Sequence, residues 1–473
     1  MLEKPEVKIG FAPTRRNICS REEALRYRKD TFDKIKKYGF ELVDINDVNE
    51  EGLLLTEEDL GKAVKIFKES DVDCIFCPHV NFGTESVVAR LGKEIGKPFL
   101  LWGPREDAPD MDCANLRYTQ VGIFATSKIL QRMGVPFSYI VNSTLKDPVF
   151  ERGFKNFVMA SNIIKNFKSI RIGQLGVRPA DFWTVICNEA ELLERFNIQV
   201  IPFNLSDIVL EVKNFLKDSR TRINEIIEDM KKNVDIEINE DEFKKVIALK
   251  EVLKNLAGQQ NISAFAIQCW TSLQAQLGIM PCFANSLLQD EGIPITCETD
   301  ITGAVSAIIA QSSRTGTPVF FADITSRHPD KDNTELLWHC GNFPLSLKKE
   351  GTGAKVVGNY LFDNPPGSAD FEIKGGDITV IRFDSIGGKY SLFSGQATGD
   401  SGPAYRGTYL WIKVGDWKKW ERKFIYGPYV HHVAAIHGRV SPVLYEASRY
   451  MDGVSFDPVD PGIDEIIDWL DCR

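Results

Sequence analysis

Histidine is rare in this chain, and half of its histidines stand close together. Of six histidines, His431, His432 and His437 lie within the seven residues HHVAAIH (431–437). Histidine is a frequent metal ligand and general base, so a cluster of this rare residue indicates a candidate site. The alternatives are a polar loop, or buried imidazoles whose hydrogen bonds end on the backbone. Clustering alone leaves these interpretations open.

Two carboxylates stand at the ends of apolar runs. Glu298 follows the run PITC, and Asp323 follows the run PVFFA. An ionised carboxylate is costly to bury there unless it is paired, hydrogen-bonded or bound to a metal. The alternative is capping, since Asp300 or Thr302 could cap the helix that follows and Asp323 could cap a turn. Because successive strand–helix units end at one sheet edge, we expect Glu298 and Asp323 about one strand spacing apart.

Short apolar runs alternate with amphipathic segments over residues 1–165. Strands are expected at 7–11, 41–45, 73–77, 98–102 and 137–141, with charged helical segments between them, such as residues 21–39. This repeated βαβ pattern predicts a mostly parallel sheet with helices on both faces. Ligands bind at the carboxyl ends of the strands in such sheets.

A second α/β domain is expected over residues 166–345. Its strands are predicted at 170–179, 198–203, 264–270, 294–300 and 318–323, and its helices at 181–197, 206–257, 280–292 and 301–316. The first two domains are therefore predicted to be Rossmann-like α/β units with parallel sheets. The third domain is expected over residues 346–473. Helical periodicity disappears across 368–399, where turns such as KGGD separate short β-rich runs, which predicts an antiparallel, barrel-like domain; helical segments are expected at 441–452 and 462–471.

The composition restricts the classes of function. The chain has 473 residues and a formal charge of −9, and such acidity is atypical of proteins that bind a nucleic-acid backbone. Its first residues, MLEKPEVKIGF, lack the apolar core of a signal peptide, and no segment is apolar for the length of a membrane span. The ten cysteines are scattered, and Cys74 and Cys77 fall in a strand-like run. We expect a reduced cytoplasmic protein that binds neither nucleic acid nor membrane.

Two segments carry a family resemblance. The segment CETDITGAVSAIIAQSSRTGTPVFFADIT (297–325) resembles the central signature of L-fucose isomerases, and GPYVHHVAAIHG (427–438) is similar to a motif shared by fucose and arabinose isomerases. The resemblance implies that Glu298 and Asp323 are metal ligands and the acid/base pair, and that His432 is the third ligand. Arabinose isomerases place a further histidine where His339 stands, which makes His339 a candidate fourth ligand.

Weaker matches suggest substrate contacts. KIGFAPTRRN resembles the family's opening strand and arginine-containing turn, which indicates Arg15 or Arg16, and AFAIQCW matches a segment that contributes a substrate-contacting glutamine, here Gln268. Trp270 is a candidate apolar wall for a sugar, and His431 is a candidate substrate contact. The resemblance further implies a homotrimer or homohexamer with active sites between protomers.

The implied reaction is the interconversion of a free aldose, similar to L-fucose, L-arabinose or D-arabinose, and its ketose through a cis-enediol. Carboxylate and imidazole ligands suit Mn²⁺, with Mg²⁺ or Co²⁺ as substitutes. The alternatives are an isomerase of an unusual modified sugar, a catalytically silent sugar-binding or regulatory homologue, and a metal-dependent hydrolase or lyase. The segment GTGAK (351–355) lacks the spacing of a phosphate-binding loop, which disfavours a sugar-phosphate substrate.

Overall fold

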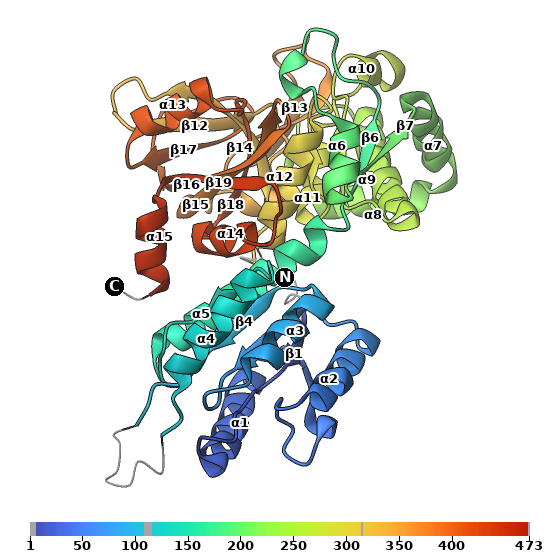
Figure 1. The fold of residues 1–473 in the computed structure, drawn as a ribbon. Helices are drawn as coiled ribbons and strands as arrows, with labels where there is room; N and C mark the ends of the chain where they lie inside the picture. The colour runs from blue at the N-terminus through green and yellow to red at the C-terminus, as the bar shows by residue number, and fades with distance from the viewer. Residues whose placement is uncertain (1–5, 108–115, 314–315, 472–473) are drawn as a thin grey trace. The chain divides into compact units, whose positions relative to one another are not determined.

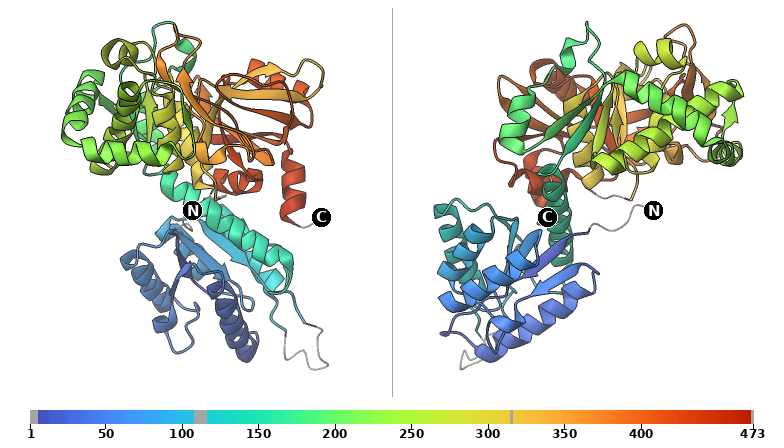
Figure 2. Two further views of the ribbon diagram at one scale, coloured as in Figure 1. Left: turned by 180° about the vertical axis from the view of Figure 1, so that it is seen from behind. Right: turned by 90° about the vertical axis from the view of Figure 1, so that its right-hand side faces the viewer.

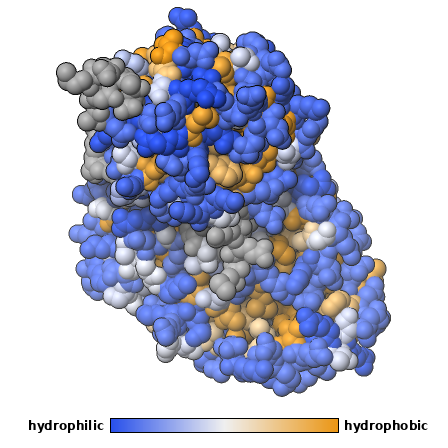
Figure 3. All heavy atoms as spheres, turned by 90° about the horizontal axis from the view of Figure 1, so that it is seen from below, coloured by the Kyte–Doolittle hydropathy of each residue, from blue (hydrophilic) through white to orange (hydrophobic). Residues whose placement is uncertain are grey.

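The computed structural model describes residues 6–107, 116–313 and 316–471, and the chain forms two compact units (Figure 1). The N-terminal unit consists of Lys4–Lys165, Pro442–Asp452 and Ile463–Arg473, and the barrel unit of Asn166–Ser441 and Gly453–Gly462. Among the described residues, every helix is too short or too polar to traverse a lipid bilayer. Figure 3 shows one face of the molecule, on which hydrophilic side chains predominate and hydrophobic ones form small groups.

A five-stranded parallel sheet forms the centre of the N-terminal unit. Its strands are β1 (Lys8–Phe11), β2 (Glu41–Asp44), β3 (Cys74–Pro78), β4 (Phe99–Trp102) and β5 (Ser138–Tyr139), in the order β2-β1-β3-β4-β5. The accompanying helices are α1 (Arg21–Lys36), α2 (Glu57–Glu69), α3 (Glu85–Ile95), α4 (Thr119–Arg132), α5 (Pro148–Phe167), α14 (Ser441–Ser448) and α15 (Ile463–Leu470), with a 3₁₀ turn η1 (Asn46–Val48). The predicted parallel α/β sheet is confirmed.

Local sequence explains these elements. Strands β3 and β4 are apolar along their whole length and completely buried, as expected for parallel strands covered by helices on both faces. Helix α2 begins with a capping box, in which Thr56 accepts the backbone N–H of Asp59 and the Asp59 carboxylate accepts the backbone N–H of Thr56.

The barrel unit begins with a four-stranded parallel sheet. Its strands are β6 (Arg171–Leu175), β7 (Gln199–Phe203), β9 (Ala264–Ile267) and β10 (Ile295–Thr296), in the order β10-β9-β6-β7. Its helices are α6 (Glu189–Phe196), α7 (Leu205–Asp218), α8 (Arg220–Met230), α9 (Glu240–Gln260), α10 (Ser272–Leu277), α11 (Cys282–Asp290) and α12 (Ile301–Ser312), with 3₁₀ turns η2 (Trp183–Val185) and η3 (Leu345–Leu347). The second predicted parallel α/β sheet is therefore confirmed.

Six antiparallel strands close into a barrel in the same unit (Figure 2). They are β11 (Phe320–Arg327), β12 (Thr334–His339), β15 (Asp377–Ile386), β16 (Lys389–Asp400), β17 (Thr408–Val414) and β18 (His432–His437). The order β16-β15-β18-β11-β12-β17 returns to β16 through a β16–β17 pairing, so the barrel has no free edge. The predicted antiparallel barrel is confirmed, and its strands β11 and β12 precede residue 346.

Further elements extend or cover the barrel. Strands β8 (Asp235–Ile236), β13 (Lys355–Gly358), β14 (Pro366–Glu372) and β19 (Val454–Asp460) add to its sheet, and α13 (Trp417–Tyr426) follows β17. Helix α12 is buried along almost its entire length, because it packs against β9 of the parallel sheet and against β15 and β18 of the barrel. The start of α12 therefore lies between the two sheets.

Replacing either of two helical glycines in the N-terminal unit by alanine should change the stability of the fold, in opposite directions. A Cβ on Gly122 of α4 would stand 1.8 Å from the backbone oxygen of Phe82, whereas a Cβ on Gly61 of α2 would meet nothing within 4 Å. We expect Gly122→Ala to destabilise the fold by about 2 kcal/mol or more, because the obstacle is backbone. Gly61→Ala should stabilise it by about 0.5–1 kcal/mol. Thermal unfolding of the full chain checks both, and equal effects would contradict the close approach of α4.

Candidate active site

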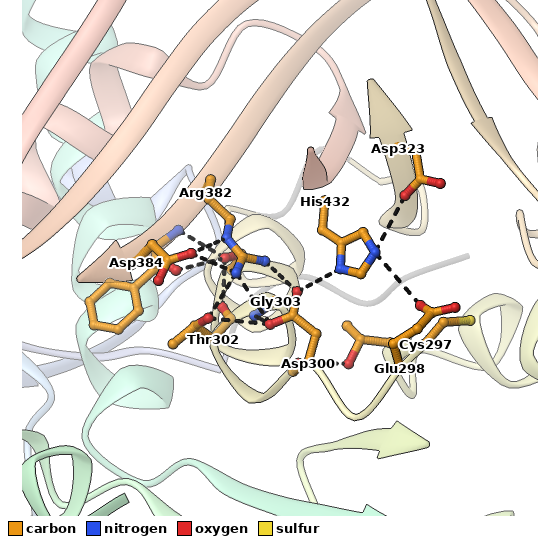
Figure 4. A network of polar contacts seen from close by, with 12 residues as sticks. Cys297, Glu298, Asp300, Thr302, Gly303, Asp323, Arg382, Asp384 and His432 are labelled. Atoms are coloured by element: carbon orange, nitrogen blue, oxygen red, sulfur yellow. Dashed lines mark hydrogen bonds and ion pairs between the residues drawn. The ribbon is translucent and has the colours of Figure 1, made fainter. Parts of the chain in front are cut away.

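Three side chains predicted as metal ligands meet in the barrel unit. The Nε2 atom of His432 lies 3.6 Å from Oε2 of Glu298 and 3.5 Å from Oδ1 of Asp323 (Figure 4). Both of these carboxylate oxygens are buried and have no hydrogen-bond partner among the described residues. Buried anionic oxygens without donors are costly, so the place fits a divalent cation bound by two carboxylates and one imidazole.

The strand ladder sets the separation of Asp323 and His432. Asp323 on β11 and His432 at the start of β18 are direct partners of an antiparallel pair, so their side chains emerge on the same face of the barrel. The expectation that Glu298 and Asp323 share one parallel sheet edge is wrong, because β10 belongs to the parallel sheet and β11 to the barrel. Asp323 also lies inside its strand and caps no turn.

Glu298 reaches the other two ligands from the loop between β10 and α12. Glu298 and Thr299 both adopt left-handed backbone conformations, with φ of 52° and 58°. Such conformations are uncommon for residues other than glycine and concentrate at functional sites. The indole N–H of Trp270 and the thiol of Cys269 donate to Oε1 of Glu298 over 3.0 and 3.3 Å. This leaves Oε2 directed toward His432.

Asp300 fixes the orientation of the His432 ring. Its carboxylate caps α12 by accepting the backbone N–H of Gly303 at 2.8 Å, so the capping alternative considered for this residue is confirmed. The same carboxylate lies 3.0 Å from Nδ1 of His432. Because an ionised carboxylate can only accept, Nδ1 donates and the lone pair of Nε2 remains for a ligand. Carboxylate–histidine pairs of this kind orient imidazoles in metal sites.

A buried arginine neutralises Asp300. Arg382 on β15 donates to Asp300 through Nη1 at 2.5 Å and Nη2 at 3.2 Å, and through Nε to Asp384 at 2.8 Å. Asp300 and Arg382 are both fully buried. Burial would raise the pKa of the Asp300 carboxyl, but Arg382 and His432 hold that pKa well below its ordinary value. Asp300 is therefore an anion that accepts hydrogen bonds.

Burial and neighbouring charges shift the other titrations. Burial raises the pKa of Asp323 to about 7, and the negative charge of Glu298 adds to this effect. Burial would lower the pKa of His432, but its hydrogen bond to Asp300 and the charge of Asp323 raise that pKa above the ordinary value. A cation bound between these groups would remove the repulsion and favour the ionised carboxylates and the neutral imidazole.

His339 ends β12 on the next strand of the barrel, with its ring centroid 6.4 Å from that of His432. The backbone N–H of Cys340 donates to Nδ1 of His339 over 2.9 Å. Burial lowers the pKa of His339 to about 3, so the ring is neutral and carries its single proton on Nε2. That Nε2 is buried and has no partner among the described residues. Metal ligation by His339 remains a prediction.

The predicted substrate contacts fall in both units. In the barrel unit, the Gln268 side-chain oxygen accepts the backbone N–H of Val177 at 3.3 Å, and the His431 ring lies 4.4 Å from that of His432. The Trp270 ring stacks on Phe362, with centroids 5.5 Å apart. These roles in binding sugar remain predictions.

Arg16 belongs to the N-terminal unit. Its guanidinium lies 3.1 Å from the Glu85 carboxylate and 4.3 Å above the centre of the Phe82 ring. His79 in the same unit is buried, and its Nδ1 donates to the backbone oxygen of Phe82. A substrate-binding role for Arg16 remains a prediction.

Sequence reasoning missed Arg382, Asp384 and Cys269. Arg382 and Asp384 are two residues apart in the run VIRFD, and such spacing places both side chains on one face of a strand. Two opposite charges on one face of an otherwise apolar strand could have indicated a buried ion pair. No comparable signal marked Cys269 as a neighbour of Glu298.

The N-terminal part of the chain matches a known family model. Residues 10–168 match the model of the fucose/sulfoquinovose isomerase N-terminal domain. Over these residues the chain is similar to that family. The predicted resemblance to the fucose isomerase superfamily is thereby confirmed.

Relatives resemble the chain beyond this domain. A protein named sulfoquinovose isomerase from Priestia aryabhattai is 22% identical over 85% of this chain and 89% of its own length. Proteins of the same name from Alkalicoccus urumqiensis and Clostridium sp. (strain MSTE9) are 26% and 24% identical, over 69% and 64% of this chain and 73% and 66% of their own lengths. The similarity to family members thus includes segments of both units.

Asp300→Asn tests whether Asp300 orients the imidazole of His432, the predicted metal ligand. An amide accepts the proton of Nδ1 less strongly and no longer neutralises Arg382, so we expect Mn²⁺ affinity to fall about 10–100-fold. The matched control is Asp384→Asn, which also removes a charge from Arg382 but leaves the contact with His432 intact. Titration calorimetry with Mn²⁺ measures both affinities. An equal loss in the two variants would contradict the orienting role.

Proposed function

We propose that the chain is a metal-dependent aldose–ketose isomerase whose substrate is a modified aldose, of which sulfoquinovose is the leading candidate. The observation that carries the reaction class is the convergence of Glu298, Asp323 and His432 in a chain whose residues 10–168 match an isomerase family. Two of their carboxylate oxygens have no hydrogen-bond partner among the described residues. The modified sugar is favoured over fucose or arabinose because the relatives that resemble most of this chain are named sulfoquinovose isomerases.

Glu298, Asp323 and His432 would hold the cation, which we expect to be Mn²⁺, with Mg²⁺ or Co²⁺ as substitutes. A divalent cation held there would polarise the carbonyl group of the sugar, acidify the C–H bond at C2 and stabilise the negative charge that develops. The partners Asp300 and Arg382 keep His432 in the tautomer that this role requires.

The two carboxylates would move the proton between C1 and C2. Isomerisation removes a proton from C2 of the aldose and returns it to C1, while a second proton passes between the two oxygens. Glu298 Oε2 and Asp323 Oδ1 both face His432 Nε2 and have no donor of their own, so each is available to accept a proton. A positioned acid/base group contributes about 10²–10⁴ in rate.

A panel of free sugars tests this function. The protein loaded with Mn²⁺ is incubated with sulfoquinovose, L-fucose, L-arabinose, D-arabinose and D-glucose, and ketose formation is followed by NMR. We expect the highest kcat/KM for sulfoquinovose. A preference for fucose or arabinose would refute the modified substrate, and binding without turnover of any sugar would favour the silent sugar-binding homologue over an isomerase.

Glu298→Gln tests the acid/base role in the same assay. The substitution keeps the shape of the side chain and removes the base, so we expect turnover to fall by a factor of about 10² or more. Glu335→Gln is the matched control, because Glu335 is another buried glutamate of this unit and pairs with Arg327, away from the three ligands. A Glu298→Gln variant that keeps more than about a tenth of the activity would refute the role.

We further propose that His339 donates a hydrogen bond from Nε2 to a substrate oxygen, since its Nδ1 already accepts from Cys340. His339→Phe should reduce kcat/KM about 10-fold or more while Mn²⁺ affinity changes less than about 2-fold. His437→Phe is the control, because its Nε2 donates to the Lys374 backbone oxygen. A collapse of Mn²⁺ affinity in His339→Phe alone would instead identify His339 as a fourth ligand.

A further inference from the structure

Four buried cysteines surround the loop that carries Glu298. Cys269 follows β9, Cys282 begins α11, Cys297 follows β10 and Cys340 follows β12. All four are free thiols. The Sγ atoms of Cys269 and Cys297 and a carboxylate oxygen of Glu298 lie within 4.8 Å of one another. Two sulfurs and one oxygen therefore converge on a point beside the candidate catalytic centre.

Two side-chain amides are directed at the sulfur of Cys297. The side-chain amides of Asn285 and Asn342 donate to its Sγ over 4.0 and 3.8 Å. Amide N–H groups directed at sulfur stabilise thiolates in metal–sulfur sites.

Glu298 faces both groups of donors. Its Oε1 accepts from Cys269 and Trp270, and its Oε2 lies 3.6 Å from Nε2 of His432, which is in turn 3.5 Å from Oδ1 of Asp323. One carboxylate therefore stands between sulfur donors on one side and oxygen and nitrogen donors on the other. A cation that prefers sulfur would engage Glu298 from the cysteine side.

We propose that Cys269, Cys297 and Glu298 form a second cation site, selective for thiophilic divalent ions such as Zn²⁺ or Cd²⁺, which competes with the catalytic cation for Glu298. On binding, the ion forms bonds to two sulfurs and one carboxylate oxygen, and the two thiol protons pass to solvent. Two positive charges replace two protons, so the net charge of the buried site is unchanged. Tetrahedral Zn²⁺ with Zn–S bonds of about 2.3 Å needs sulfurs about 3.8 Å apart, which the cluster admits.

Buried cysteines often serve only as small apolar side chains. Cys74 and Cys77 on β3 fit that description, because both are fully buried and neither joins a group of metal-binding donors among the described residues. Cys269 and Cys297 differ from them in their proximity to an anionic oxygen and in the amides directed at Cys297. Cys77 is therefore the matched control.

Metal spectroscopy on the full chain tests the site without any activity assay. X-ray absorption of the wild-type protein with one equivalent of Zn²⁺ should show sulfur neighbours at about 2.3 Å. Co²⁺ should give a thiolate-to-cobalt charge-transfer band that Cys297→Ser loses and Cys77→Ser retains. A Zn²⁺ spectrum with only oxygen and nitrogen neighbours would overturn the proposal, as would a Co²⁺ band that survives in Cys297→Ser.

The competition for Glu298 has its own readout. Zn²⁺ at the thiol site should lower the affinity for Mn²⁺ at least 10-fold in the wild-type protein and less than 2-fold in Cys297→Ser. The affinity is measured from the electron paramagnetic resonance signal of free Mn²⁺. Equal effects in the two proteins would overturn the competition. Inhibition of sugar turnover by Zn²⁺ is the consequence that rests on the proposed function. If no sugar is turned over, the proposed function fails, while the spectroscopic tests of the thiol site stand unaffected.

Discussion

The geometry of the candidate active site depends on one buried anion, the Asp300 carboxylate. It accepts the backbone N–H of Gly303 at the start of α12, two guanidinium nitrogens of Arg382 on β15, and Nδ1–H of His432 on β18. A buried charge is tolerated only when nearly all of its hydrogen-bonding capacity is used, and removing one partner leaves the others uncompensated. Asp300 therefore links the helix to two barrel strands, and the same contacts determine which nitrogen of His432 faces Glu298 and Asp323.

The sequence contained local signals for much of this arrangement, but not for its long-range part. Alternating apolar runs and amphipathic segments were sufficient to predict two parallel sheets, because both patterns are local. Glu298 and Asp323 were recognisable as carboxylates that follow apolar runs. His432 was recognisable as one of three histidines close together in the chain. The pairing of β11 with β18 could not be predicted, because local sequence periodicity does not indicate which strands far apart in the chain pair, or in what register. The contact of Arg382 with Asp300 could not be predicted for the same reason, since the two residues are 82 positions apart in the chain.

The identity of the sugar is a different kind of question from the reaction class. Groups that act at C1 and C2 meet atoms that all aldoses share, so the same ligands serve isomerases of many sugars. Contacts with C3 to C6 decide which sugar binds, and they come from side chains that no short motif identifies. This difference explains why motifs around Glu298 and His432 suggested fucose and arabinose, whereas relatives similar over most of the chain carry the name of a modified sugar.

The three proposed ligands are held with unequal rigidity. Asp323 and His432 are partners in the ladder of a closed barrel, so their separation is fixed by backbone hydrogen bonds. Glu298 stands on a loop with two successive left-handed residues, and its carboxylate is held by side chains alone. It is also the one ligand that faces sulfur on one side and nitrogen and oxygen on the other. If the proposed sites bind cations, the barrel would offer the same two donors to any divalent ion, and Glu298 with the thiols beside it would decide between hard and soft cations.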